Sequence, residues 1–90
     1  MPKYVVERNV LGASTLSAKE LQEIAAKSNS VVAGLGVPYR WETSYVAGDK
    51  IYCVHEAPDA ETIHRHAREG GFPADAVTEI AAEIAPETAA

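Results

Sequence analysis

Residues 39–56 read YRWETSYVAGDKIYCVHE and contain the clearest structural pattern in the chain. Large or β-branched residues alternate with polar ones on both sides of Ala47–Lys50, which is typical of half-buried strands. The Gly-Asp centre of the connecting segment suits a tight turn. The stretch therefore predicts a hairpin of two antiparallel strands, Tyr39–Val46 and Ile51–Glu56.

The register of this hairpin is the same for a two-residue and a four-residue loop. It predicts three directly opposed pairs, which are Tyr45 with Tyr52, Ser44 with Cys53, and Glu42 with His55. Because side chains alternate across a strand, one face is expected to be aromatic and the other compact. The aromatic face holds Trp41, Tyr45 and Tyr52. The compact face, expected beneath the helices, holds Ser44, Val46, Ile51 and Cys53.

The residues before the hairpin predict a strand followed by a helix. Lys3–Val10 is rich in valine and tyrosine and reads as a strand. Ser17 and Glu20 have the spacing of a capping box, and an apolar stripe with helical spacing follows. Gly36 and Pro38 are expected to end this helix after about five turns.

The residues after the hairpin predict a second helix and a last strand. Asp59 is placed to cap a short helix with a weak apolar stripe, and Gly70 and Gly71 end it. Val77–Ile84 is assigned to a final strand. We expect residues 1–84 to form a single domain and residues 85–90 to be a frayed C-terminal tail.

The element order strand, helix, strand, strand, helix, strand matches the ferredoxin-like arrangement. The predicted fold class is therefore α+β, a βαββαβ sandwich with a four-stranded antiparallel sheet and both helices on one face. The other face would leave Trp41, Tyr45 and Tyr52 exposed. Since soluble monomers rarely expose large apolar patches, we expect a homodimer that covers this face.

Composition narrows the function classes. The chain has 90 residues, 47% of them hydrophobic, and a formal net charge of −5. This acidic balance argues against binding to nucleic acid, and no apolar run has the length of a membrane span or signal peptide. We expect a cytoplasmic protein without a membrane partner. The single cysteine, Cys53, lies in a predicted strand and reads as a packing residue.

Three histidines, His55, His64 and His66, are candidates for metal binding or proton transfer. His64 and His66 lie about 200° apart around a helix, so one ion cannot take both. His55 opposite Glu42 would place an imidazole beside a carboxylate, which suits shared metal binding or a plain cross-strand ion pair. No motif of a hydrolase, a phosphate-binding loop or a zinc protease is present.

Several segments resemble a family of small bacterial proteins of unknown function that includes a nickel-binding, nickel-responsive member. They are PKYVVER at 2–8, SYV at 44–46, DKIYCV at 49–54, APD at 57–59 and HAREGGFPAD at 66–75. The resemblance implies a ferredoxin-like sandwich, usually homodimeric, with no established reaction. It also implies that His66 matches a histidine common in the family, whereas Thr43 stands where many relatives have histidine.

Two functional hypotheses follow. The first is a cytoplasmic homodimer that binds nickel or a similar divalent ion as a buffer or sensor, with His66, His55 and Glu42 as the ligands. The alternative is a small-molecule-binding protein or cofactor-independent enzyme with a pocket between sheet and helices. Trp41, Tyr45 and Tyr52 are the aromatic residues that would line either this pocket or the dimer face. A structural or interaction protein without a small ligand is the remaining class.

Overall fold

The computed structural model describes residues 1–90, and its helices and strands occur in the predicted order. The strands and helices are β1 (Lys3–Asn9), α1 (Ala18–Gly34), β2 (Arg40–Ala47), β3 (Lys50–Glu56), α2 (Ala60–Gly70) and β4 (Ala76–Glu79). Single 3-10 turns lie at Ala13–Thr15 and Pro86–Ala89. Neither α1 nor α2 has the length and hydrophobicity needed to span a bilayer.

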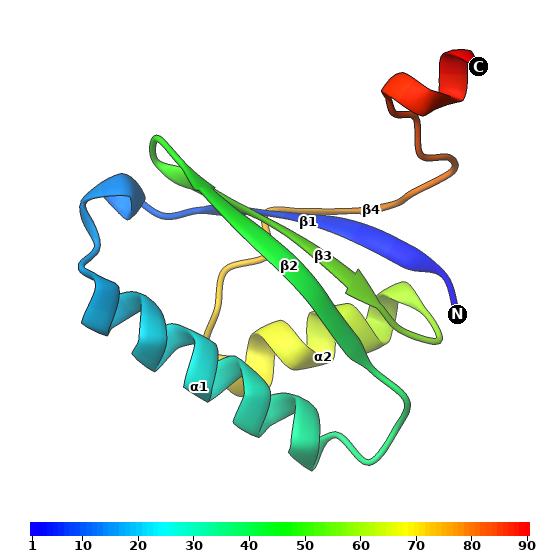
Figure 1. Cartoon of the computed structure of the whole chain (residues 1–90). Helices are drawn as coiled ribbons and strands as arrows, with labels where there is room; N and C mark the ends of the chain where they lie inside the picture. Colours follow the sequence, from blue (N-terminus) through cyan, green and yellow to red (C-terminus); the bar gives the residue numbers. More distant parts are fainter.

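The four strands form one antiparallel sheet in the order β2-β3-β1-β4. Figure 1 shows α1 and α2 together below this sheet, and its upper face uncovered. The prediction of a ferredoxin-like α+β sandwich with both helices on one face is confirmed.

Local signals in the sequence define the ends of both helices. The Ser17 side chain accepts from the Glu20 backbone N–H, and the Glu20 side chain accepts from the Ser17 backbone N–H, so the predicted capping box is present. Asp59 caps α2 by accepting from the Thr62 backbone N–H. Gly71 ends α2 with a φ of 69°, a left-handed conformation that favours glycine.

The hairpin register is confirmed at two of the predicted pairs and wrong at the third. Tyr45 lies opposite Tyr52 and Ser44 opposite Cys53, but Trp41, not Glu42, lies opposite His55. The cause is a β-bulge between Trp41 and Thr43. One extra residue in a strand reverses the faces of all side chains beyond it.

The bulge moves two predicted site residues to opposite faces. Trp41 is on the helix-covered side, where it donates from Nε1 to Ser44 Oγ at 2.8 Å. Glu42 instead forms an ion pair with Lys3, with 2.9 Å between its Oε1 and the Lys3 Nζ. The prediction that Trp41 shares the open face with Tyr45 and Tyr52 is therefore wrong.

β4 is shorter than predicted. It pairs only with β1 and ends at Glu79, although the Ile80 backbone N–H still donates to the Lys3 carbonyl. Beyond this point β1 has no residues left to pair, so a strand reaching Ile84 has no partner. The last residues extend away from the body of the protein (Figure 1), and Ile84 is 83% exposed.

The interior below the sheet contains polar as well as apolar residues. The apolar core is small and centres on Val6, Ala57 and Ile63, which are fully buried. Four polar or charged residues are buried in the same layer: Arg8, Ser28, His55 and His66. Because buried polar groups need partners, this layer is where a functional site is expected.

Candidate functional site

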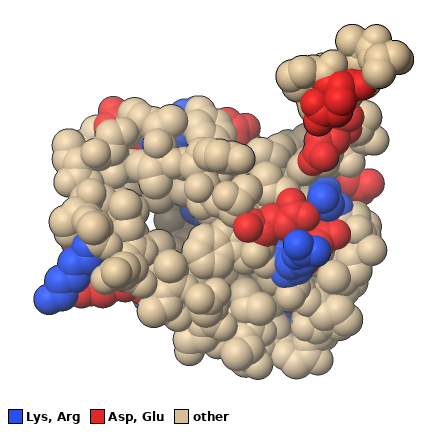
Figure 2. Space-filling view, viewed as in Figure 1, with Lys and Arg blue, Asp and Glu red and all other residues tan.

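A cavity of about 380 Å³ lies between α1 and the sheet. Figure 2 shows it as a hollow with a basic side chain visible inside. Its walls come from β1, α1, β2, β3, α2 and the loop that follows α2. Among its lining residues are Arg8, Leu21, Ile24, Ala25, Ser28, Trp41, Ser44, Cys53, His55, His66 and Phe72.

The cavity exists because α1 packs against α2 and its apolar stripe does not reach β2. Two of the residues that line the cavity, Ala25 on α1 and Ser44 on β2, have short side chains. Leu21, on the same stripe, stays 37% exposed. Protein interiors are normally close-packed, so a hollow of this size departs from ordinary packing.

Arg8 is the only charged residue that lines the cavity, and its side chain is buried. Its guanidinium donates from Nε to Cys53 Sγ at 3.3 Å and from Nη1 to the Pro73 carbonyl at 2.5 Å. The Arg8 Cζ also lies 5.5 Å from the centre of the Phe72 ring. None of the ion pairs in the structure includes Arg8.

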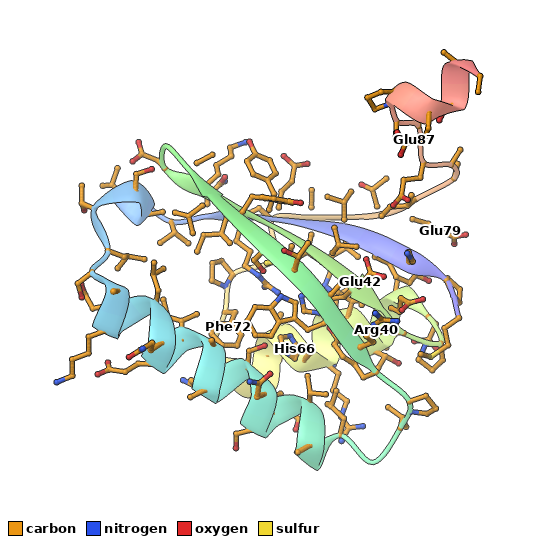
Figure 3. The ribbon with its side chains drawn as sticks, in the orientation of Figure 1. Arg40, Glu42, His66, Phe72, Glu79 and Glu87 are labelled. Atoms are coloured by element: carbon orange, nitrogen blue, oxygen red, sulfur yellow. The ribbon has the colours of Figure 1, made fainter.

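His66 projects from α2 into the same layer and is 1% exposed. Its Nε2 shares a hydrogen bond of 3.0 Å with Ser28 Oγ, while its Nδ1 is buried without a partner. The ring stacks between Tyr39 and Phe72, with centroid distances of 5.1 and 5.6 Å. Figure 3 shows His66 and Phe72 next to each other beneath the sheet.

His55 reaches the same place from β3 and is also 1% exposed. Its Nδ1 shares a hydrogen bond of 2.6 Å with the Tyr39 hydroxyl. The centres of the His55 and His66 rings are 5.1 Å apart. Tyr39 therefore contacts both imidazoles, one through its hydroxyl and the other through its ring.

Burial sets the charge of these groups. It lowers the pKa of His55 to about 3, with further lowering by His66 and Arg8. It lowers the pKa of His66 to about 4, again with help from Arg8 and against the opposing effect of Glu69. Burial also raises the pKa of Tyr39. At neutral pH both imidazoles and the phenol are uncharged, and the Arg8 guanidinium is the only formal charge at the cavity.

The structure brings together only part of the residue set predicted from sequence. His55 and His66 lie side by side, and Trp41 joins them in the cavity wall. Glu42 is held by Lys3, away from the two imidazoles. Tyr45 and Tyr52 face each other on the open side of the sheet, and Tyr45 is 64% exposed.

Sequence reasoning missed Arg8, Ser28 and Tyr39 as site residues. A signal for Arg8 was present, since it follows Tyr4 and Val6 at alternate positions of the first strand. Strict alternation places its side chain on the buried face with theirs.

The side chains of one chain do not fit a metal ion. No three histidine, cysteine, aspartate or glutamate side chains converge anywhere in the structure. The two buried imidazoles are in the neutral form that metals need, but the Arg8 cation lines the same cavity and would repel a divalent ion.

Fold and site together define a ferredoxin-like α+β protein with an internal, mostly apolar cavity. The chain matches the family described as nickel responsive protein SCO4226-like over residues 4–80, and it belongs to that family. It is similar to the crystal structure of SCO4226 from Streptomyces coelicolor A3(2), with a TM-score of 0.74 and 21% sequence identity. The match covers 91% of this chain and 99% of that one. No curated protein matches.

Proposed function

We propose that this protein binds a small organic molecule in the cavity between α1 and the sheet. The observation that supports this function best is the cavity itself, which is mostly apolar and has a few polar groups at fixed positions. Its volume of about 380 Å³ is in the range of small-molecule sites, and its mixture of walls is typical of them. Binding would restore the packing contacts that α1 lacks.

A binding screen with a matched pair of variants tests this function. Amide chemical shifts are followed while indole, hexanoate, phenylacetate and phenylacetamide are added to the parent. We expect at least one compound to shift the Ala25, Ser28 and Ser44 signals, because these residues line the cavity.

The variant Ala25→Phe should abolish this binding by filling the space. Ala26→Phe, one position along the helix and exposed, is the control and should leave it unchanged. If no compound shifts the cavity signals, or if Ala25→Phe binds as well as the parent, the proposed function is wrong.

Response to nickel is a second candidate, and family membership favours it. A single chain does not supply three converging ligands, so this function requires His55 and His66 to be completed by water or by a second copy. Equilibrium dialysis of tag-free protein with nickel at pH 7.5 tests it. His66→Ala and His55→Ala should each weaken binding, while Glu42→Ala should not, because Lys3 holds Glu42 elsewhere. Equal affinities in all four proteins would remove the two imidazoles from the site.

We also propose that the protein is a cytoplasmic homodimer formed through the open sheet face. Tyr45 is exposed on β2, and Val54 lies two residues from Tyr52 on the same face. Light scattering should report about twice the chain mass of 9.6 kDa. Val54→Glu should give a monomer, and the control Leu11→Ser, in a loop where Leu11 is 91% exposed, should not. A monomeric parent would refute the proposal.

A further inference from the structure

We infer that the ligand of this cavity is an organic monocarboxylate with a compact apolar body, and that the Arg8 guanidinium binds its carboxylate. This inference rests on the proposed function, because it specifies the chemistry of a molecule in that cavity.

The first step of the argument is the missing counter-ion of Arg8. Its side chain is 5% exposed, and its two hydrogen-bond acceptors are a sulfur and a backbone carbonyl. Buried charges in proteins are normally paired or bound to an ion. All five ion pairs of the structure use other residues. A buried cation without a carboxylate beside an accessible cavity is the arrangement of an anion-binding site.

The second step is that one nitrogen of the Arg8 guanidinium is free to bind a ligand. Nε and Nη1 each make a hydrogen bond, and these two bonds fix the plane of the guanidinium. Nη2 makes none, yet it is not among the buried polar atoms without a partner, so it stays accessible. Arg8 lines the cavity. Guanidinium N–H groups are strong donors to carboxylate oxygens, so the free Nη2 can bind one.

The third step is the charge of the walls. No aspartate or glutamate lines the cavity, although the whole chain has a net charge of −5. The two imidazoles are neutral at pH 7.5. One positive charge therefore faces the cavity, which matches a single carboxylate better than a phosphate with two charges or a divalent metal ion.

The fourth step is the shape of the remaining space. Nine of the fifteen lining residues are hydrophobic. Leu21 and Ile24 form the α1 side, and Trp41 and Phe72 offer aromatic surface on the other sides. A carboxylate held at Arg8 would place the rest of the molecule against these apolar walls. This combination selects an acid with an apolar or aromatic body over a small inorganic anion.

The test compares an acid with its neutral isostere. Trp41 is the only tryptophan and lines the cavity, so its fluorescence reports binding. Phenylacetate and phenylacetamide are titrated into the parent, Arg8→Met, Arg8→Lys and Arg40→Met at pH 7.5. Inorganic phosphate is titrated as a charged probe without an apolar body. Circular dichroism verifies that each variant is folded.

We expect phenylacetate to bind the parent at least tenfold more tightly than phenylacetamide. Arg8→Met should lose this preference, and Arg8→Lys should retain part of it because the charge remains without the planar fork. Arg40 lies on the open face and pairs with Glu56. The control variant Arg40→Met should therefore show the same preference for the acid as the parent.

Three results would overturn the inference. The first is equal affinity of the parent for the acid and the amide, which refutes the carboxylate but leaves the proposed function standing. The second is an undiminished acid preference in Arg8→Met. The third is binding of phosphate alone, or of neither organic probe. The neutral compounds in the screen of the proposed function, indole and phenylacetamide, then show whether the cavity binds a small molecule without a carboxylate.

Discussion

Acidification should destabilise this protein steeply below pH 6.5, because its two buried imidazoles resist protonation. A histidine in the unfolded chain has a pKa of about 6.5. In the folded protein the pKa of His55 is lowered to about 3 and that of His66 to about 4. Between these values the unfolded chain binds protons that the folded chain does not. Stability is therefore full above pH 6.5 and falls as the pH decreases toward 4.

The size of the effect follows from these pKa values. Each proton taken up only by the unfolded state costs about 1.4 kcal/mol of stability per pH unit. Two imidazoles give a slope that approaches about 2.7 kcal/mol per unit well below pH 6.5, and the integrated loss is about 3 kcal/mol between pH 6.5 and 5. This is a large fraction of the roughly 5–15 kcal/mol by which domains are stable.

Urea unfolding at a fixed protein concentration, from pH 7.5 to 5 with EDTA present, measures this slope. Circular dichroism at 222 nm follows the two helices. His66→Gln should halve the slope because one titrating group is removed. Ser28→Ala removes the hydrogen bond between Ser28 and His66 but leaves both imidazoles in place. It should therefore keep the slope of two protons. A parent slope below about half a proton would refute the reasoning, since the imidazoles would then protonate in the folded state.

Three further outcomes concern single positions. Arg8→Met should change the free energy of unfolding by only about 1 kcal/mol, because the loss of two hydrogen bonds is offset by no longer burying an unpaired charge. Urea unfolding measures this change, and a loss above about 3 kcal/mol would assign Arg8 a structural role. Gly70→Ala should cost about 1–3 kcal/mol and shift the aromatic signals of Phe72, because its new Cβ would overlap that ring; a thermal melt and one-dimensional NMR report both. Cys53, 5% exposed, should react slowly with a bulky aromatic disulfide in native buffer and quickly in denaturant, and rapid native labelling would contradict its place beneath the helices.

The fold was accessible from the sequence because its signals are local. The capping box of Ser17 and Glu20, the turn at Ala47–Lys50 and the left-handed Gly71 each depend on a few neighbouring residues. Alternation within β2 and β3 then gave two of the three predicted pairs correctly. With the element order in place, few topologies remain for so short a chain.

The wrong predictions for β2 come from the single extra residue of its β-bulge. The bulge at Glu42 has no signature in the alternating pattern of β2, and it arises from the fit between the strand and its partner. Because faces alternate with a period of two, this single insertion exchanged the positions expected for Trp41 and Glu42. The predicted metal set lost its carboxylate in the same way.

The candidate site depended on tertiary structure, because its members are far apart in the chain. Arg8 meets Cys53 and Pro73, and Ser28 meets His66 across 38 positions. Local patterns determine which residues form strands and helices and which face each one buries. Local patterns do not determine the distance between α1 and the sheet. That distance results from the packing of α1 on α2 and from the short side chains that line the cavity. That distance leaves the cavity open, and with it a buried arginine without a counter-ion.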